Sequence, residues 1–222
     1  MHTLRQFLPH LIFTLITTTL CALFLKISLG AFFAPFFLAA MTTPAFAKES
    51  KSTLHASIIA LALSIGPILV FSALTLFSAL TFKMTSPVFL TLLAFNLLLA
   101  HLTRLLKFAG LTSAIALIFL AWPVWLPPHL SDDSKWIDLL VNLHPLLAIN
   151  APLQDLGIWS QLPIAYQITS LGQDIPYSFP SIVTHLGLIL AITIIVILLT
   201  VARNFAVARL RPYNPPFTKA HG

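Results

Sequence analysis

The chain has 222 residues, of which 58% are hydrophobic and only 8% are charged. Because a soluble domain of this size is about one quarter charged, this composition excludes an ordinary water-soluble fold and indicates a chain solvated mostly by lipid. A membrane protein acquires a net charge of +6 by keeping Lys and Arg on its cytoplasmic side, so we expect no nucleic-acid partner. The single cysteine, Cys21, lies inside an apolar run, which excludes an internal disulfide and a cluster of thiolate metal ligands.

Six apolar runs predict an all-α, polytopic membrane protein with six transmembrane helices in a single domain over residues 1–222. The expected spans cover residues 7–25, 27–47, 56–82, 87–102, 108–126 and 181–202. Only Lys26 separates the first two runs, which predicts a tight hairpin whose bend uses residues 26–30; a single re-entrant hairpin is the alternative. Ala45-Phe46-Ala47 resembles a signal-peptide cleavage site, but the 47 residues before Lys48 are too long for a signal peptide, and we expect them to be retained.

The third to sixth apolar runs differ in length and in the residues expected to kink or end them. The third is long enough to cross with tilt and is expected to kink near Gly66-Pro67. The fourth lies at or slightly below the lower length limit for a span, and the fifth, over residues 108–126, ends in Pro123, Pro127 and Pro128, which stop a helix. The sixth is the most uniformly apolar and is closed by Arg203.

The basic residues predict the orientation. Six spans put both termini on one side, and nine of the twelve Lys and Arg residues fall on that side together. These nine are Arg5, Lys48, Lys51, Arg104, Lys107, Arg203, Arg209, Arg211 and Lys219. All the aspartates fall on the other side, with Lys26, Lys83 and Lys135. Since positive residues stay inside, both termini are predicted to be cytoplasmic.

Residues 127–180 form a predicted outer cap between the last two spans. Ser131-Asp132-Asp133 is typical of a helix start, and the mixture of aromatic, apolar and acidic residues after it favours a helix lying at the membrane interface. A second apolar and polar stretch covers residues 164–171. Trp159, Tyr166 and Tyr177 are expected to anchor the cap at the level of the lipid headgroups.

A short charged stretch between the second and third spans carries a resemblance. The residues concerned are Lys48, Glu49, Lys51, Ser52, Thr53 and Leu54. They are similar to the Glu-Arg-Glu-x-Gly-Thr-Leu stretch that follows the second span in type-2 exporter permeases of the ABC transporter superfamily. Ser52 stands where that family has glycine, and Ser50 interrupts the charges. The family also has short outer helices between its last two spans, and an Asn-Pro-like step there that His144-Pro145 weakly resembles.

The resemblance implies a permease subunit in a bacterial plasma (inner) membrane. It implies that the cytoplasmic elbow touches a separate ATP-binding subunit through Lys48, Glu49, Lys51, Thr53 and Leu54. It also implies assembly with a second copy or a homologous permease, as a homodimer or heterodimer surrounded by membrane lipid. The substrate is not indicated.

The chemistry missing from the sequence limits the function further. No Gly-x-x-x-x-Gly-Lys-Ser/Thr stretch and no catalytic constellation occurs, so we expect neither an enzyme nor a bound cofactor. No Asp, Glu, Lys or Arg lies in the middle of a span, which argues against a proton- or ion-coupled transporter. The alternative to a permease is therefore a non-catalytic accessory or assembly subunit of a larger membrane complex, for example a respiratory one.

The histidines leave two further alternatives open. His10 and His101, near the ends of two spans, are a candidate pair of ligands for a b-type haem, although helix-end residues of this kind more often reach the headgroups. His129 and His144 with Asp132 and Asp133 have the residue types of a metal site but no ligand spacing that supports one. We therefore expect neither haem nor metal.

Overall fold

The computed structural model describes residues 2–24, 29–77, 82–125, 134–149, 152 and 180–210. Within these residues the regular structure is entirely α-helical, as predicted. The helices are α1 (His2–Phe24), α2 (Leu29–Ala47), α3 (Thr53–Phe77), α4 (Phe82–Leu106), α5 (Ala109–Trp125), α6 (Ser134–Leu143), α7 (Pro145–Ala148) and α10 (Ile182–Leu210).

Three of these helices are long and apolar enough to cross a membrane. The qualifying segments are Thr53–Val70 in α3, Thr85–Leu106 in α4 and Ile182–Arg209 in α10. The other apolar segments, Leu11–Leu20, Phe32–Ala47 and Ala109–Pro123, are shorter. This composition is typical of an integral membrane protein.

Several helix ends differ from the predicted ones. The fourth span was expected over residues 87–102, but α4 runs from Phe82 to Leu106 and is about 37 Å long, which is enough to cross. Of the residues expected to form the first bend, Leu29 and Gly30 belong to α2, and residues 26–28 lie outside the described residues. The last helix does not end near Arg203 but continues to Leu210. Arginine is a good helix former, so a charge that marks a membrane edge does not end the helix.

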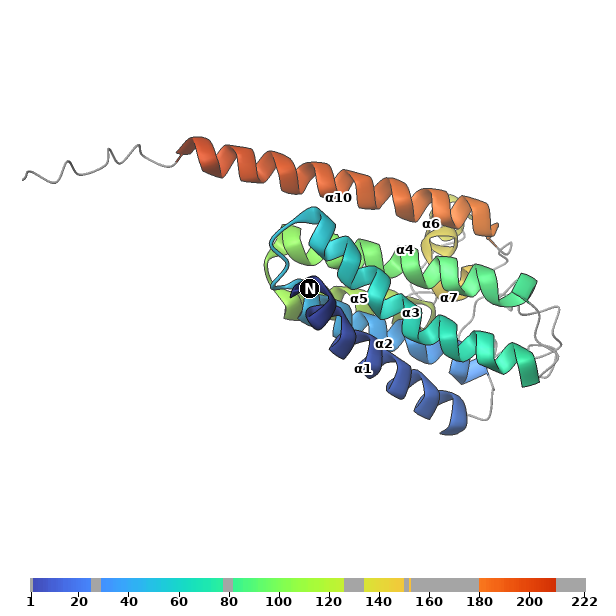
Figure 1. The fold of residues 1–222 in the computed structure, drawn as a ribbon. Coiled ribbons are helices and arrows are strands. Elements are labelled where there is room, and N and C mark those ends of the chain that lie inside the picture. The colour runs from blue at the N-terminus through green and yellow to red at the C-terminus, as the bar shows by residue number, and fades with distance from the viewer. Residues whose placement is uncertain are drawn as a thin grey trace, which may run out of the picture.

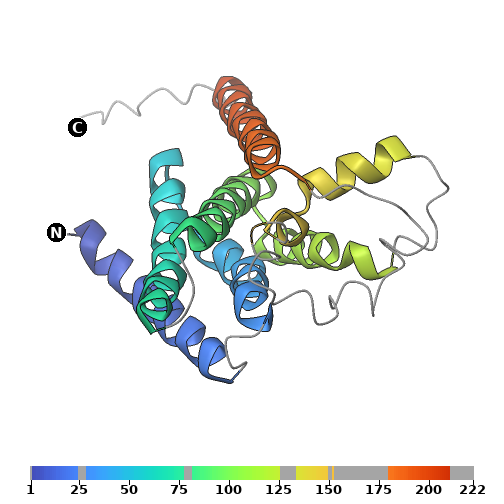
Figure 2. The same cartoon turned by 90° about the vertical axis from the view of Figure 1, so that its right-hand side faces the viewer.

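The helices are arranged around α4, which contacts α2, α3, α5, α7 and α10 (Figure 2). The first helix, α1, packs chiefly against α3 and only slightly against α2, its expected hairpin partner. The last helix, α10, packs along α4 and leaves most of its surface open (Figure 1). Since α10 is almost wholly apolar, this open surface is suited to lipid.

The main core lies where α2, α4, α5 and α7 meet. Its buried residues are Phe32, Phe36, Ala39, Ala40, Val88, Leu92, Phe95, Leu99, Ala116, Leu120, Leu146 and Ile149. A second, small-residue cluster of Ala47, Ala56, Ala60 and Ala100 joins α2, α3 and α4. Alanine lets helix backbones approach closely, which is how helices associate when lipid removes the hydrophobic driving force.

Part of the predicted outer cap is described, and it is more deeply inserted than expected. The helix α6 is amphipathic, with Trp136 exposed and Ile137 and Val141 buried. Residues 144–149, however, are all buried, and α7 packs into the main core instead of lying at the interface. Leu146 and Ile149 gain more from burial there than at a wet surface. The predicted helix start at residues 131–133, the stretch 164–171 and the three aromatic anchors lie outside the described residues.

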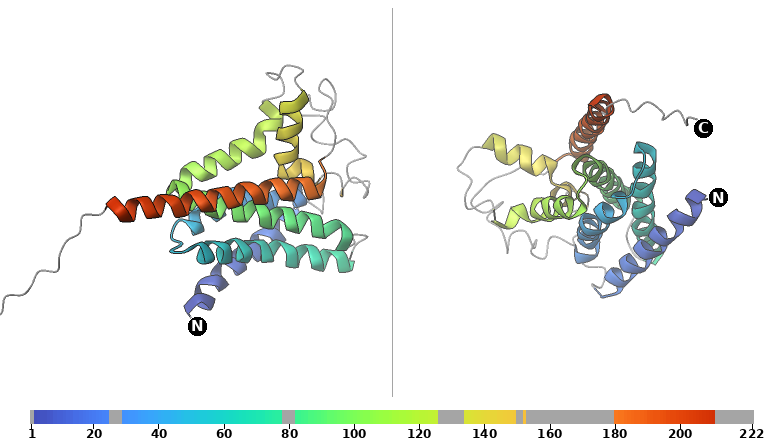
Figure 3. Two further views of the ribbon diagram at one scale, coloured as in Figure 1. Left: turned by 90° about the horizontal axis from the view of Figure 1, so that it is seen from above. Right: turned by 90° about the vertical axis from the view of Figure 1, so that its left-hand side faces the viewer.

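The helix ends sort into two groups. Figures 1 and 3 show that α1 begins and α10 ends at the same end of the bundle as the turn between α2 and α3. The turn between α4 and α5 also lies there, and α6 and α7 lie nearer the opposite end. This end of the bundle gathers most of the candidate functional residues.

Candidate functional site at the charged end of the bundle

The predicted elbow is a tight turn between two apolar helices. It begins where α2 ends at Ala47 and finishes where α3 begins at Thr53. Ser50 N donates to Ala47 O at 3.0 Å, which closes the turn. Ser52 caps α3, since its Oγ accepts from His55 N at 3.1 Å. The serine found in place of the family's glycine therefore has a local role as a helix N-cap.

The five predicted coupling residues divide into an exposed group and one anchored residue. Lys48, Glu49, Lys51 and Leu54 are exposed, and Leu54 is 70% exposed although it is a large apolar side chain. Thr53 is half-buried, and its Oγ1 accepts from Arg104 Nη1 at 2.8 Å. The elbow thus offers charge and one apolar side chain to its surroundings while being tied to α4 beneath it.

The end of α4 connects this elbow to the last helix. Arg203 of α10 donates from Nη1 to Leu105 O, and its Nη2 donates to Arg104 O at 3.3 Å. These carbonyls lie in the last turn of α4, where they have no partner within the helix and where a cation is favourable. Lys107 then ends the helix with a positive φ of 58°, the left-handed conformation that usually selects glycine.

A cavity of about 330 Å³ opens among these elements. Its walls come from the elbow, from the end of α4 and the turn after it, and from α10. The lining residues are Lys48, Ser50, Lys51, Thr103, Arg104, Lys107, Arg203 and Asn204. Five of these eight are cationic and none is acidic. We call this the basic cavity.

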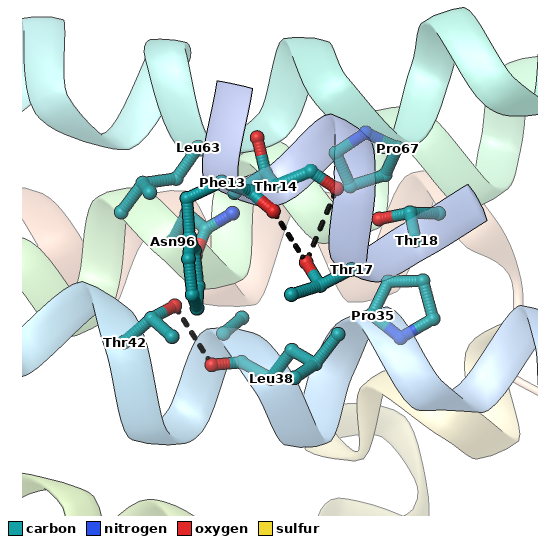
Figure 4. Close-up of a pocket in the computed structure, with 11 residues that line it drawn as sticks. Phe13, Thr14, Thr17, Thr18, Pro35, Leu38, Thr42, Leu63, Pro67 and Asn96 are labelled. Atoms are coloured by element: carbon teal, nitrogen blue, oxygen red, sulfur yellow. Dashed lines mark hydrogen bonds between the residues drawn. The ribbon is translucent and has the colours of Figure 1, made fainter. Parts of the chain in front are cut away.

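A short chain of hydrogen-bonded polar side chains joins α2, α3 and α4 inside the bundle. Asn96 of α4, 1% exposed, accepts from Thr43 Oγ1 and donates from Nδ2 to Ser64 Oγ at 2.9 Å. Ser64 Oγ in turn donates to Ala60 O. Beside this chain lies a cavity of about 10 Å³, lined by Thr14, Thr17 and Thr18 of α1 and by Asn96, among others (Figure 4). That volume holds about one water molecule and is no passage for a substrate.

His144 is the most deeply buried titratable group described outside the spans. Its Nδ1 accepts from Leu147 N at 3.3 Å as the N-cap of α7, so its Nε2 carries the hydrogen and donates to Leu120 O at 3.2 Å. Its ring packs against those of Phe119 and Trp122, both with centroids at 5.6 Å. Burial lowers the pKa of His144 from 6.5 to about 3, so the ring is neutral at physiological pH.

The other histidine hypotheses find little geometry to support them. His101 lies within reach of Ser57 Oγ at 3.2 Å, and the side chain of its proposed haem partner His10 lies outside the described side chains. Both ring nitrogens of His144 already bond to backbone groups, and His129, Asp132 and Asp133 lie outside the described residues. Within the described part of the chain, no group of three or more His, Cys, Asp or Glu side chains is placed to hold a metal ion.

The sequence missed two features of this site. The polar chain through Asn96 has a signal, since Asn96 is the only asparagine within the fourth apolar run, but its partners on α2 and α3 cannot be read from spacing. The charge bias of the sequence predicted that the five cations of the basic cavity lie on one side of the membrane, but it did not predict that they surround one cavity. Comparisons of this chain with models of protein families, with curated proteins and with solved structures gave no match.

Proposed function

We propose that this chain is the membrane-spanning permease subunit of an ATP-driven transporter similar to the type-2 exporter permeases of the ABC superfamily. A separate ATPase subunit supplies the energy, because the sequence has no nucleotide-binding motif of its own. The substrate moves between this chain and a second permease, either another copy or a homologous partner.

The observation that carries the proposal is the elbow. It exposes Glu49 between two lysines and presents Leu54, a large apolar side chain that is 70% exposed. An apolar side chain with charges around it has the makeup of a small protein contact, with a desolvated centre and a polar rim. The same residues carry the resemblance to the family's ATPase-contacting elbow.

The hydrogen bonds that join the elbow to α4 and α10 suggest how a displacement of the elbow would be transmitted to the bundle. Thr53 is bonded to Arg104 on α4, and Arg203 on α10 is bonded to the carbonyls of Arg104 and Leu105. A displacement of the elbow would therefore move α4 and α10 together. An ATPase moves the permease between two states only if it contacts those states with different free energies.

The proposal includes the full topology. All six apolar helices cross a bacterial plasma membrane, with both termini and the elbow in the cytoplasm and α6 and α7 toward the outside. The gathering of Lys48, Lys51, Arg104, Lys107 and Arg203 around one cavity supports this orientation, because cytoplasmic ends retain basic residues.

Charge reversal at the elbow tests the coupling. We expect Glu49→Lys to reduce the amount of co-purified Walker-motif ATPase roughly five- to tenfold, since it turns an attractive rim charge into a repulsive one. The matched control is Asp138→Lys, which makes the same change at an exposed position on α6, away from the elbow. Unchanged ATPase recovery with Glu49→Lys, or equal loss with both variants, would count against the elbow as the contact.

An accessory or assembly subunit of a larger membrane complex is the second candidate. The observation that favours it is that no Asp, Glu, Lys or Arg lies in the middle of a predicted span, since a scaffold needs no charge there. It predicts that the chain is purified with membrane partners and without any Walker-motif ATPase. Mass spectrometry of the purified complex distinguishes the two candidates directly.

A further inference from the structure

The basic cavity concentrates positive charge without any visible compensation. Five cationic side chains surround it, and the lining holds no acid. Arg203 bonds the backbone carbonyl of Arg104, whose own guanidinium bonds Thr53, and both arginine side chains line the same cavity. Like charges that share a cavity repel each other unless an anion lies between them.

Two donors at the cavity are left without partners. Ser50 Oγ and Arg203 Nε are enclosed, yet neither has a hydrogen-bond partner among the described residues. Buried polar atoms are nearly always satisfied, and an exception often marks the place of a ligand, ion or water. Both residues line the basic cavity, so its wall contains unsatisfied polar atoms, although these two atoms are enclosed by protein and do not face the open volume.

The backbone conformation of Lys107 also supports an anion-binding site at the cavity. Lys107 holds φ at 58°, where glycine costs less and where a β-carbon is crowded. A lysine kept in this conformation at the wall of the cavity contributes a positive charge that glycine would lack. Strain of this kind is often retained where a site depends on it.

The depth of the cavity indicates where its ligand comes from. Arg203 is 21 residues beyond Ile182 in α10, or about 32 Å along the helix axis, which matches a hydrocarbon core of about 30 Å. Arg203 is therefore expected at the level of the phosphate groups. The preceding turn of α10 exposes Leu198 and Leu199, 61% and 52% exposed, which provide apolar surface for an acyl chain on the same helix as Arg203.

From these observations we propose that the basic cavity binds the phosphate group of an anionic phospholipid in the leaflet on the elbow side of the membrane. Its volume of about 330 Å³ lies in the range of small-ligand sites, about 300–1,000 Å³. The lysines and arginines that line the cavity neutralise the phosphate and donate charge-assisted hydrogen bonds to its oxygens. The inference does not depend on the transporter proposal, because it concerns this chain without any ATPase.

The test measures lipid-dependent stabilisation of the purified full-length protein in detergent. Phosphatidylglycerol and phosphatidylcholine with identical acyl chains are titrated separately, and the thermal midpoint is followed, since a ligand that binds only the folded state raises it. We expect phosphatidylglycerol to raise the midpoint saturably and phosphatidylcholine to do so much less. Equal responses to both lipids would overturn the proposal.

Charge-removing variants locate the site. A Lys or Arg close to the anionic headgroup strengthens binding about fivefold, and the effect falls off over about a Debye length, so Lys107→Gln should weaken the apparent affinity about fivefold and Lys51→Gln with Lys107→Gln about 25-fold. Neither lysine side chain bonds another described residue, and Lys48→Gln is a further single variant should the double variant fold poorly. The control Arg209→Gln removes one charge from exposed α10 outside the cavity and should change the affinity less than twofold. Wild-type affinity in the folded double variant would overturn the proposal.

Inorganic phosphate distinguishes the source of the ligand. A lipid bound through both its headgroup and its chain should resist millimolar phosphate at constant ionic strength. If phosphate alone stabilises the protein and displaces phosphatidylglycerol, the ligand is a soluble phosphate and the lipid assignment is wrong.

Discussion

At the scale of single residues, His144 combines two roles that require it to be neutral. Its Nδ1 must be free of hydrogen to cap α7, and its ring lies among Phe119 and Trp122 with no water-facing edge. Protonation would remove the capping acceptor and leave a charge in an apolar site.

This arrangement predicts a pH dependence of stability. The pKa of His144 is about 3 in the folded protein and 6.5 when unfolded, so between these values the unfolded state binds more protons. Stability is therefore complete above pH ~6.5 and falls below it by at most about 1.4 kcal/mol per pH unit. His144→Asn keeps a capping oxygen without a titrating ring, so thermal midpoints between pH ~7 and ~5 should fall less steeply than in the wild type. An equal slope would assign the effect to another group, such as the neighbouring His185.

The sequence identified the elbow residues but not which buried polar side chains would bond to one another. The elbow residues Lys48 to Leu54 were singled out from charge density, and the structure describes them as an exposed turn. The bonds of Asn96 to Thr43 and Ser64 depend on which faces of apolar helices meet. In lipid those faces carry no amphipathic pattern, so the sequence has no signal for their pairing.

At the scale of helices, α1 and α3 approach each other through Gly66. A β-carbon added there would lie 2.7 Å from the backbone nitrogen of Leu15 and closer still to the side chain of Thr14. A backbone atom cannot rotate away, so any larger residue must push α1 from α3. The small residue at this crossing allows the close packing by which membrane helices associate.

Gly66→Ala should therefore destabilise the protein by about 1–3 kcal/mol, as overpacking does. The matched control is Gly187→Ala in α10, where an added β-carbon would have no described atom within 4 Å apart from its own helix backbone and chain neighbours. That variant should be neutral or stabilising by up to about 1 kcal/mol, because glycine weakens a helix interior. Thermal unfolding in one detergent compares the two, and equal midpoints would show that α1 is not held tightly at Gly66.

Helix existence was predicted well, and helix ends less so. The runs of apolar residues located all six long helices, but α4 and α10 extend past the apolar limits at Leu102 and Ala202. Hydropathy measures the part of a helix that lipid can cover, while hydrogen bonding and propensity carry the helix further. The burial of α7 was not predicted, because apolar residues in a cap suit an interface and a core equally well.

At the scale of the whole molecule, basic residues are concentrated at one end of the bundle. The elbow end holds the basic cavity with its five cationic side chains, whereas α6, nearer the other end, carries one base and one acid, Lys135 and Asp138. The coupling proposal requires the elbow on the cytoplasmic side, whereas the lipid proposal holds for either side. A partner ATPase reaches it only from the cytoplasm, and anionic lipids are concentrated in the cytoplasmic leaflet of many membranes.

Cysteine labelling in intact cells tests this orientation. In a Cys21→Ser background, Glu49→Cys and Asp138→Cys place one thiol on each end of the bundle, both at exposed positions. With a membrane-impermeant maleimide, we expect Asp138→Cys to react in intact cells and Glu49→Cys to react only after the membrane is opened, because the basic end is retained inside. The two positions are each other's control, since equal reaction of both before opening would show leaky cells. Reaction of Glu49→Cys alone would place the elbow outside the cell, where no ATPase could drive it, and the transporter proposal would then be wrong.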